Sequence, residues 1–173
     1  MAQGQEAGPL AARFIGQKNK DYLYFQAVYG ILAAHFLIMG LVYLMNPESA
    51  LEPFYWLGVT LGGREYPVAE HSHVWRVLAG TNVLTLGFLC VFLQLDVKRH
   101  WPAIYPLVFM KGATALAFMG VRLFAVSYPA FWAVAVRDAA ICGLFVYFGG
   151  LGKKAAEEDE SVLVPRPLGY RAE

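Results

Sequence analysis

The stretch PAIYPLVFMKGATALAFMGVRLF, residues 102–124, decides the fold of this 173-residue chain. A helix needs about 20 mainly apolar residues to cross the hydrocarbon core of a bilayer, and this stretch is long enough. It nevertheless carries Lys111 near its middle. The stretch therefore predicts a membrane-spanning helix in which one charge needs a partner.

Three further stretches, at about residues 22–45, 74–95 and 129–150, have the same apolar character. The whole chain is 58% hydrophobic and only 16% charged, which is too apolar for an ordinary soluble domain. We therefore expect an all-α polytopic membrane protein, an antiparallel bundle of four transmembrane helices. A polar tail precedes the first helix and no small-residue cleavage site follows it, so we expect it to remain as a span.

The connections between these helices differ in length and chemistry. Asn46-Pro47 is expected to end the first helix. Residues 47–61 (PESALEPFYWLGVTL) mix acids with aromatics, so we expect an interfacial segment on the membrane surface, limited by Pro53 to two short helical pieces. Residues 1–21 are interpreted as a polar tail and residues 151–173, which hold the acidic run 157–160, as a disordered tail.

Basic residues outside the predicted spans are distributed unequally between the two sides. Those on the side of both termini are Arg13, Lys18, Lys20, Lys98, Arg99, Lys153, Lys154, Arg166 and Arg171, against Arg64 alone on the other side. The positive-inside rule then places both termini in the cytoplasm, and we expect a bacterial inner (cytoplasmic) membrane protein. The lipid bilayer is its expected surrounding. The formal net charge of +1 argues against a nucleic-acid partner.

Three ionisable residues fall near the middle of the predicted spans: Lys111, Arg137 and Asp138. Lys111 lies about nine residues from one end of its helix, and the other two lie about as far from the opposite end of theirs. Antiparallel helices would bring all three to a similar depth, so Lys111 is predicted to meet Asp138. Two interpretations remain open: a structural ion pair that fixes helix register, and a polar cavity.

Cations outnumber acids within the spans. Glu65 and Glu70 of the outer connection are expected to neutralise Arg76 and Arg122, which leaves one positive charge in excess near Asp138. An anionic or carbonyl-bearing ligand would satisfy that charge. The candidate ligand-binding residues are Lys111, Arg137, Asp138, Arg76, Arg122 and Thr114, the last because it shares a helix face with Lys111 and Arg122 at 100° per residue.

Two other helix faces combine small residues with polar ones. On the first span the face is Gln26, Tyr29, Gly30, Ala33 and Gly40, and on the second it is Arg76, Ala79, Gly80, Val83, Gly87, Cys90 and Gln94. Close helix contact is the favoured interpretation for Gly80 and Gly87. Such faces also predict a protein partner or homo-oligomer. His35 projects away from the first face, and its role stays ambiguous.

Metal and cofactor chemistry has little support in the sequence. His71 and His73 with Glu70 and Glu65 are ordinary ligand types, but a solvated polar rim explains them as well, so we expect no metal. No catalytic residue set can be assembled, and we expect no cofactor beyond a quinone or a lipid.

The chain resembles the small four-helix membrane proteins of the DoxX-like kind over about residues 25–150. The resemblance rests on Asn46-Pro47, on Leu57-Gly58, and on RVLAGTNVLTLG (residues 76–87) with Arg76, Gly80 and Gly87. It implies a compact bundle, associated in some members of the family with quinone-linked sulfur or redox-stress proteins. It transfers no catalytic residue.

Two functions follow as hypotheses. The first is a small membrane accessory or subunit protein without catalytic activity of its own. The alternative is a binder or redox partner for an amphipathic ligand, a quinone or lipid, whose polar head is held by intramembrane cations while Phe118 and Phe145 cover its apolar part. A transporter is less favoured, because Asp138 beside two cations would stay ionised and carry no proton.

Overall fold

The computed structural model describes residues 17–64, 73–125, 128–159 and 162, and every regular element within them is helical. Four helices are long and apolar enough to cross a membrane, as predicted. They are α2 (Lys20–Met45), α4 (His73–Leu95), α5 (Ile104–Phe124) and α6 (Ala130–Glu158). A shorter helix, α3 (Pro47–Thr60), follows α2, and the 3-10 turn η1 (Trp101–Ala103) precedes α5.

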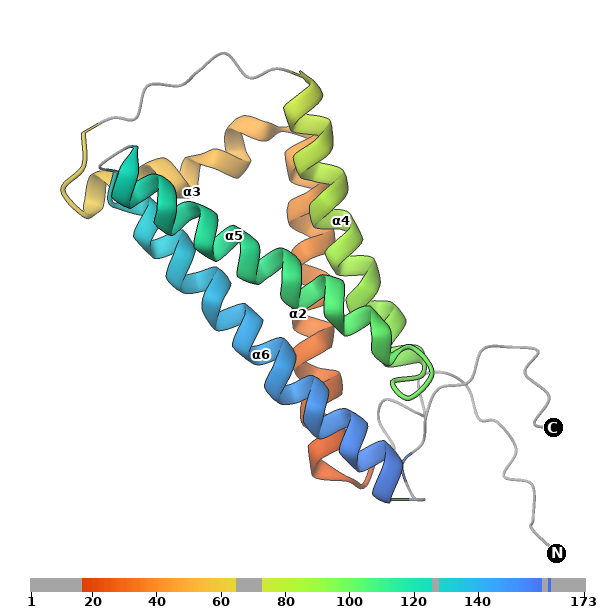
Figure 1. Cartoon of the computed structure of the whole chain (residues 1–173). Coiled ribbons are helices and arrows are strands. Elements are labelled where there is room, and N and C mark those ends of the chain that lie inside the picture. Colours follow the sequence, from red (N-terminus) through yellow and green to blue (C-terminus); the bar gives the residue numbers. More distant parts are fainter. Residues whose placement is uncertain (1–16, 65–72, 126–127, 160–161, 163–173) are drawn as a thin grey trace, which may run out of the picture.

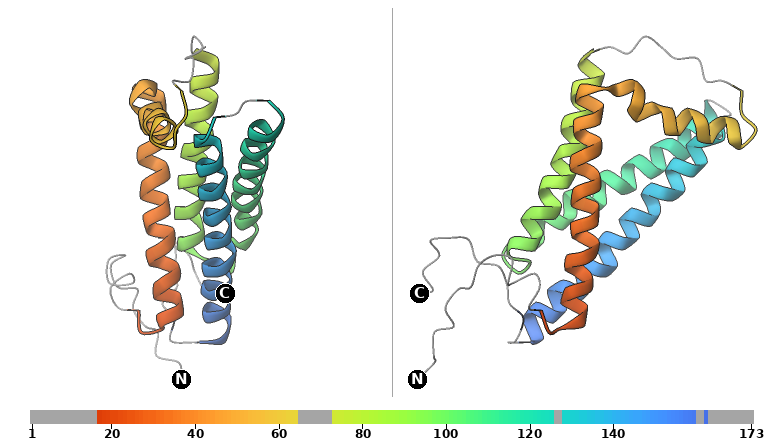
Figure 2. Two further views of the ribbon diagram at one scale, coloured as in Figure 1. Left: turned by 90° about the vertical axis from the view of Figure 1, so that its left-hand side faces the viewer. Right: turned by 180° about the vertical axis from the view of Figure 1, so that it is seen from behind.

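The long helices form two pairs that diverge toward one end of the molecule. Helix α2 packs along α4, and α5 packs along α6 (Figure 1). At the wide end α3 runs from the end of α2 to the start of α6, so that α2, α3 and α6 outline a triangle (Figure 2, right). We call this the α3 end. At the opposite, narrow end the first turn of α2 meets the last turn of α6, where Asn19 Nδ2 donates to Asp159 Oδ2 at 2.8 Å.

Glycines bring α2 and α4 into close contact. A Cβ built on Gly40 would stand 2.7 Å from Leu84 Cγ, one on Gly80 2.6 Å from Leu44 Cγ, and one on Gly87 2.7 Å from Leu37 Cγ. Leu37 opposite Gly87 and Leu44 opposite Gly80 show that the two helices run in opposite directions. Gly80 and Gly87 therefore serve helix contact within the chain, the interpretation favoured from sequence.

The main core lies between α2, α4, the first turn of α5 and α6, toward the narrow end. An aromatic column runs through it from Tyr22 to Phe25, Tyr29 and Phe145, with ring centroids 4.7 to 5.5 Å apart. The Tyr29 hydroxyl donates to the Phe145 carbonyl at 2.9 Å, which satisfies a polar group in an apolar setting. Because this core stops short of the α3 end, it leaves the pairs free to diverge there.

A second, smaller cluster holds the α3 end together. Phe54 of α3 lies 5.5 Å from the ring of Tyr128 and 5.5 Å from that of Phe131. The Tyr128 hydroxyl donates to the carbonyl of Tyr55 at 3.2 Å. Aromatic contact and a hydrogen bond thus attach α3 to the first turn of α6.

Helix α3 is continuous, and the prediction that Pro53 would divide it into two short pieces is wrong. Proline inside a helix removes one backbone hydrogen bond and costs about 3 kcal/mol. The helix is held on both sides of Pro53: Asn46 caps its start by accepting from the Ser49 amide at 3.4 Å, and Phe54 packs on α6. These contacts offset the missing bond.

Helix α6 continues to Glu158, eight residues beyond the predicted end of the fourth span, so the predicted disordered tail is wrong for this part. Hydropathy falls after Gly150, but Ala155 and Ala156 remain buried against the core. The ion pairs Lys153–Glu157 at 3.9 Å and Lys154–Glu158 at 4.0 Å join side chains one turn apart.

Candidate functional site

Lys111 and Asp138 meet between α5 and α6. The Lys111 Nζ atom lies 3.1 Å from Asp138 Oδ1 and donates to it. Only 9% of the lysine side chain and 2% of the aspartate side chain are exposed. An ionised carboxylate buried to this extent is stable only with charged or hydrogen-bonding partners, and the lysine supplies one.

Arg137 reaches the same carboxylate oxygen from the neighbouring position on α6. Its Nε and Nη2 atoms both lie 3.3 Å from Asp138 Oδ1. Unlike Lys111, Arg137 leaves 57% of its side chain exposed. In the part of the chain that the structure describes, one acid therefore contacts two cations; the three side chains together carry a formal charge of +1, and Arg137 is the exposed one.

Helix α2 contributes an aromatic ring to the site. The Phe36 ring, which is 2% exposed, lies with its centroid 5.0 Å from Lys111 Nζ and so adds a cation–π contact. The cluster thus joins three helices. We define it as the Asp138 cluster: Phe36, Lys111, Arg137 and Asp138.

Two predicted site residues of α5 lie apart from this cluster. The Thr114 hydroxyl donates to the Met110 carbonyl of its own helix. Arg122 is in the last turn of α5, eleven residues beyond Lys111, which is roughly 16 Å along a helix. Its Nε atom is buried and has no hydrogen-bond partner in the described part of the chain. Neither residue contributes a contact to Asp138.

The remaining predicted residues cannot be placed. Glu65, Glu70 and His71 lie outside the described ranges, and of Arg76 and His73 only the helical backbone at the start of α4 is described. Pairing of the two glutamates with the outer arginines thus stays a prediction. Among the described residues, no three His, Cys, Asp or Glu side chains are placed to share a metal ion.

Phe36 is the member of the cluster that sequence reasoning missed. It is an apolar residue in an apolar span, so composition gives no sign that its ring contacts Lys111. That contact depends on how α5 crosses α2, which no periodicity in the sequence contains. His35, whose role the sequence left ambiguous, is exposed on α2.

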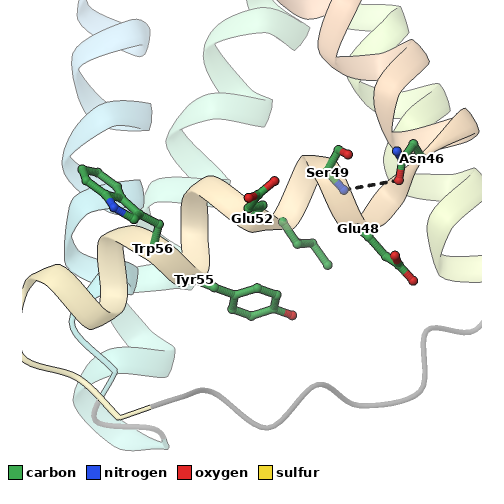
Figure 3. A pocket seen from close by; sticks show the side chains of 7 residues that line it. Asn46, Glu48, Ser49, Glu52, Tyr55 and Trp56 are labelled. Atoms are coloured by element: carbon green, nitrogen blue, oxygen red, sulfur yellow. Dashed lines mark hydrogen bonds between the residues drawn. The ribbon is translucent and has the colours of Figure 1, made fainter.

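A shallow depression of about 570 Å³ lies along α3, as Figure 3 shows. Asn46, Glu48, Ser49, Leu51, Glu52, Tyr55 and Trp56 line it. All of these belong to α3 or to its cap, and none belongs to the Asp138 cluster. The depression is thus a surface feature of α3, separate from the intramembrane charges.

The arrangement has the features of an ion cluster with surplus positive charge on an apolar helical protein. Such a site can fix helices to one another and can hold an anion through Arg137, whose guanidinium has several donors. Four candidate transmembrane helices indicate an integral membrane protein, and the ion cluster lies between helices of this set. No protein-family model, curated protein or solved structure matches the chain.

Proposed function

We propose that this chain is a small, non-catalytic membrane protein that holds the anionic head of an amphipathic molecule beside Arg137. The observation that supports the proposal is the charge balance of the Asp138 cluster. Within the described ranges Asp138 is the one acid that contacts Lys111 and Arg137, so these three side chains carry a formal net charge of +1, and Arg137 is the cation that remains 57% exposed.

The energetic argument concerns where this charge lies. A cation in the hydrocarbon region costs about 2.5–3.5 kcal/mol on insertion scales, which favours any anion able to reach it. Arg137 is the eighth residue of α6, so it is roughly 10 Å along the helix from its start. A lipid-soluble anion could approach laterally, since 57% of the Arg137 side chain is exposed.

The surroundings of Arg137 suit an amphipathic molecule. Val136, next to Arg137 on α6, is 64% exposed and offers apolar surface for an acyl or isoprenoid chain. Because the charge left over at the cluster is positive, the proposed ligand is a lipid-soluble carboxylate or phosphate rather than a neutral quinone.

We propose a membrane placement to match. The four long helices would cross the bilayer as an antiparallel bundle, with α3 on its outer surface and both termini in the cytoplasm of a bacterial cell. The cation asymmetry of the loops supports this orientation. Trp56 of α3, 66% exposed, is of the type that accumulates at membrane–water interfaces.

The test is retention of endogenous ligand. The full-length protein is purified in mild detergent, and bound amphipaths are extracted and quantified by mass spectrometry for wild type, Arg137→Gln and Lys154→Gln. Lys154 is the matched control, an exposed cation on the same helix beyond the apolar stretch. Anionic amphipaths should remain with wild type and the control and be lost from Arg137→Gln. Equal retention by all three proteins would refute the proposal.

A second candidate is the accessory role, in which a partner helix rather than a lipid supplies the acid. Ala139 and Gly143, one turn apart, lie exposed on the outward side of α6, and a Cβ on Gly143 would meet nothing within 4 Å. Small residues of this kind permit close approach of another helix. A photocrosslinker at Gly143 should then give one discrete adduct that a crosslinker at exposed Ala27 of α2 does not give.

A further inference from the structure

Helix α4 carries a polar side chain on its exposed surface, close to the middle of the helix. Asn82 is exposed and lies two residues from Leu84, the middle residue of α4. Helix α4 is one of the four helices that are long and apolar enough to cross a membrane. In the proposed membrane placement, Asn82 therefore lies at the level of the hydrocarbon, which offers an amide neither a donor nor an acceptor.

The Asn82 amide differs in its hydrogen bonding from the exposed hydroxyls beside it on α4. The Thr81 hydroxyl donates to the Val77 carbonyl at 2.8 Å, and the Thr85 hydroxyl donates to the Thr81 carbonyl at 2.9 Å. Within the described ranges, the Asn82 side chain makes no hydrogen bond. Its two amide hydrogens and its carbonyl oxygen are thus available to a further partner.

Asn82 points away from the contact between α4 and α2. Gly80 packs on Leu44 of α2, and a helix turns by roughly 100° per residue, so Asn82 lies roughly 160° around α4 from that contact. Leu78, one turn before Asn82, lies on the same side and is 47% exposed. Ala79, between Gly80 and Leu78, is exposed as well and small enough to let another helix approach closely.

We propose that this face of α4 binds the same face of a second copy of the chain, so that the two Asn82 side chains pair in a homodimer. Two copies inserted in the same direction have parallel α4 helices, so equal residues meet at equal depth about a twofold axis.

The chemistry of the amide favours a second copy as the partner. The amide nitrogen of each Asn82 can donate to the oxygen of the other, so one residue supplies both sides of a reciprocal pair. Such bonds between membrane helices replace a polar group left facing hydrocarbon. The proposal uses the proposed membrane placement but not the Asp138 cluster, which lies on α2, α5 and α6.

The dimer fraction in lipid vesicles tests the pairing. Full-length protein carrying one fluorophore is reconstituted in phosphatidylcholine vesicles at several protein-to-lipid ratios, and single-molecule photobleaching counts the copies. Asn82→Leu should weaken the dimer about tenfold, the size expected for two hydrogen bonds between membrane helices. Thr85→Val is the control, since it removes a hydroxyl that is bonded to its own helix, and it should dimerise like wild type. A monomeric wild type, or equal dimerisation of wild type and Asn82→Leu, would overturn the proposal.

Disulfide crosslinking locates the contact on α4. Val77 and Leu78 are adjacent and both 47% exposed, but they lie roughly 140° and 40° from Asn82 around the helix. In a background with Cys90 and Cys142 replaced by alanine, Leu78→Cys should form a disulfide-linked dimer several-fold faster than Val77→Cys. Equal rates would overturn the proposal, because the copies would then not meet through this face. Neither measurement involves Arg137, so the dimer and the anion site can fail separately.

Discussion

At the scale of single residues, Asp138 is the junction of the ion cluster. Lys111 and Arg137 both donate to the same carboxylate oxygen, so the acid has two partners while each cation has one acid. Removing the acid leaves Lys111 buried without a counter-charge. Removing Lys111 leaves Asp138 bonded to Arg137. The loss of folding stability should therefore be larger when Asp138 is removed than when Lys111 is removed.

The residue-scale prediction follows from this asymmetry. Asp138→Asn should lower the free energy of unfolding by about 3–5 kcal/mol, the usual cost of leaving a buried charge unpaired. Lys111→Met keeps a similar volume and apolar packing against Phe36, so it should lower the free energy of unfolding by less. Unfolding by a denaturing detergent, followed by circular dichroism, measures both. If Lys111→Met proved the more damaging change, Asp138 would not be the junction.

The sequence was sufficient to predict the Lys111–Asp138 contact, but not which other residues of α5 belong to the site. Equal spacing from opposite helix ends was sufficient to predict that Lys111 and Asp138 would meet. Thr114 and Arg122 share the helical phase of Lys111, but one bonds its own backbone and the other is about three turns away. The helical phase of a residue shows which face of the helix it lies on. It does not show whether the residue is at the right height along the helix to reach Asp138.

At the scale of elements, the α2–α4 contact depends on glycine at some positions and not at others. Gly40→Ala places a methyl group against the Leu84 side chain and its backbone nitrogen, 2.8 Å away. Overpacking of this kind costs about 1–3 kcal/mol. Gly30→Ala meets only Gln94 Oε1 at 3.8 Å, so it should be neutral or stabilising by up to about 1 kcal/mol through its better helix propensity.

Thermal unfolding of Gly40→Ala and Gly30→Ala in the same detergent distinguishes these cases. The melting temperature should fall for the first and hold or rise for the second. Similar losses in both variants would show that the helices pack equally tightly along the whole contact.

The attachment of α3 to α6 gives a second prediction at this scale. Tyr128→Phe removes the hydrogen bond to the Tyr55 carbonyl but keeps the aromatic contact with Phe54, so it should weaken the attachment by about 0.5–1.5 kcal/mol. Amide hydrogen exchange should become faster in α3 and stay unchanged in the α2–α4 pair. Tyr147→Phe, an exposed tyrosine on α6, is the control. Unchanged exchange in α3 would show that the Tyr128–Tyr55 hydrogen bond does not stabilise the attachment of α3.

Element boundaries were predictable where composition changes sharply. Asn46-Pro47 ends α2 as expected, with the Asn46 amide donating to the Val42 carbonyl at 2.7 Å. Hydropathy could not show that α6 continues past Gly150, because the continuation is amphipathic rather than apolar. Nor could it show that contacts made by Phe54 and Tyr128 outweigh the helix-breaking tendency of Pro53, since those contacts are tertiary.

At the scale of the whole molecule, both described chain ends lie at the narrow end and α3 lies at the opposite end (Figure 1). The Asn19–Asp159 hydrogen bond ties the start of α2 to the end of α6. Cysteines introduced at Lys18 and Glu158 should thus share one side of the membrane, and a cysteine at Thr60 should be on the other. The divergence of the two helix pairs belongs to this scale too, and no local sequence pattern predicts it.

Labelling with an impermeant maleimide checks this topology in intact and permeabilised cells, in a background with Cys90 and Cys142 replaced by alanine. The cysteine at position 60 should react in intact cells, and those at 18 and 158 only after permeabilisation. Reaction of positions 18 and 60 from the same side would contradict the proposed crossing.

The most direct test of the central claim, that surplus charge on Arg137 binds an anion, is a native mass-spectrometry titration with matched amphipaths. A long-chain fatty acid and its methyl ester differ only in head charge, and a phosphatidate compared with a diacylglycerol separates phosphate from carboxylate recognition. Wild type should form one-to-one adducts with an acid and not with its neutral counterpart, and Arg137→Gln should form neither. Equal binding of acid and ester by wild type, or of the acids by wild type and Arg137→Gln, would contradict the account.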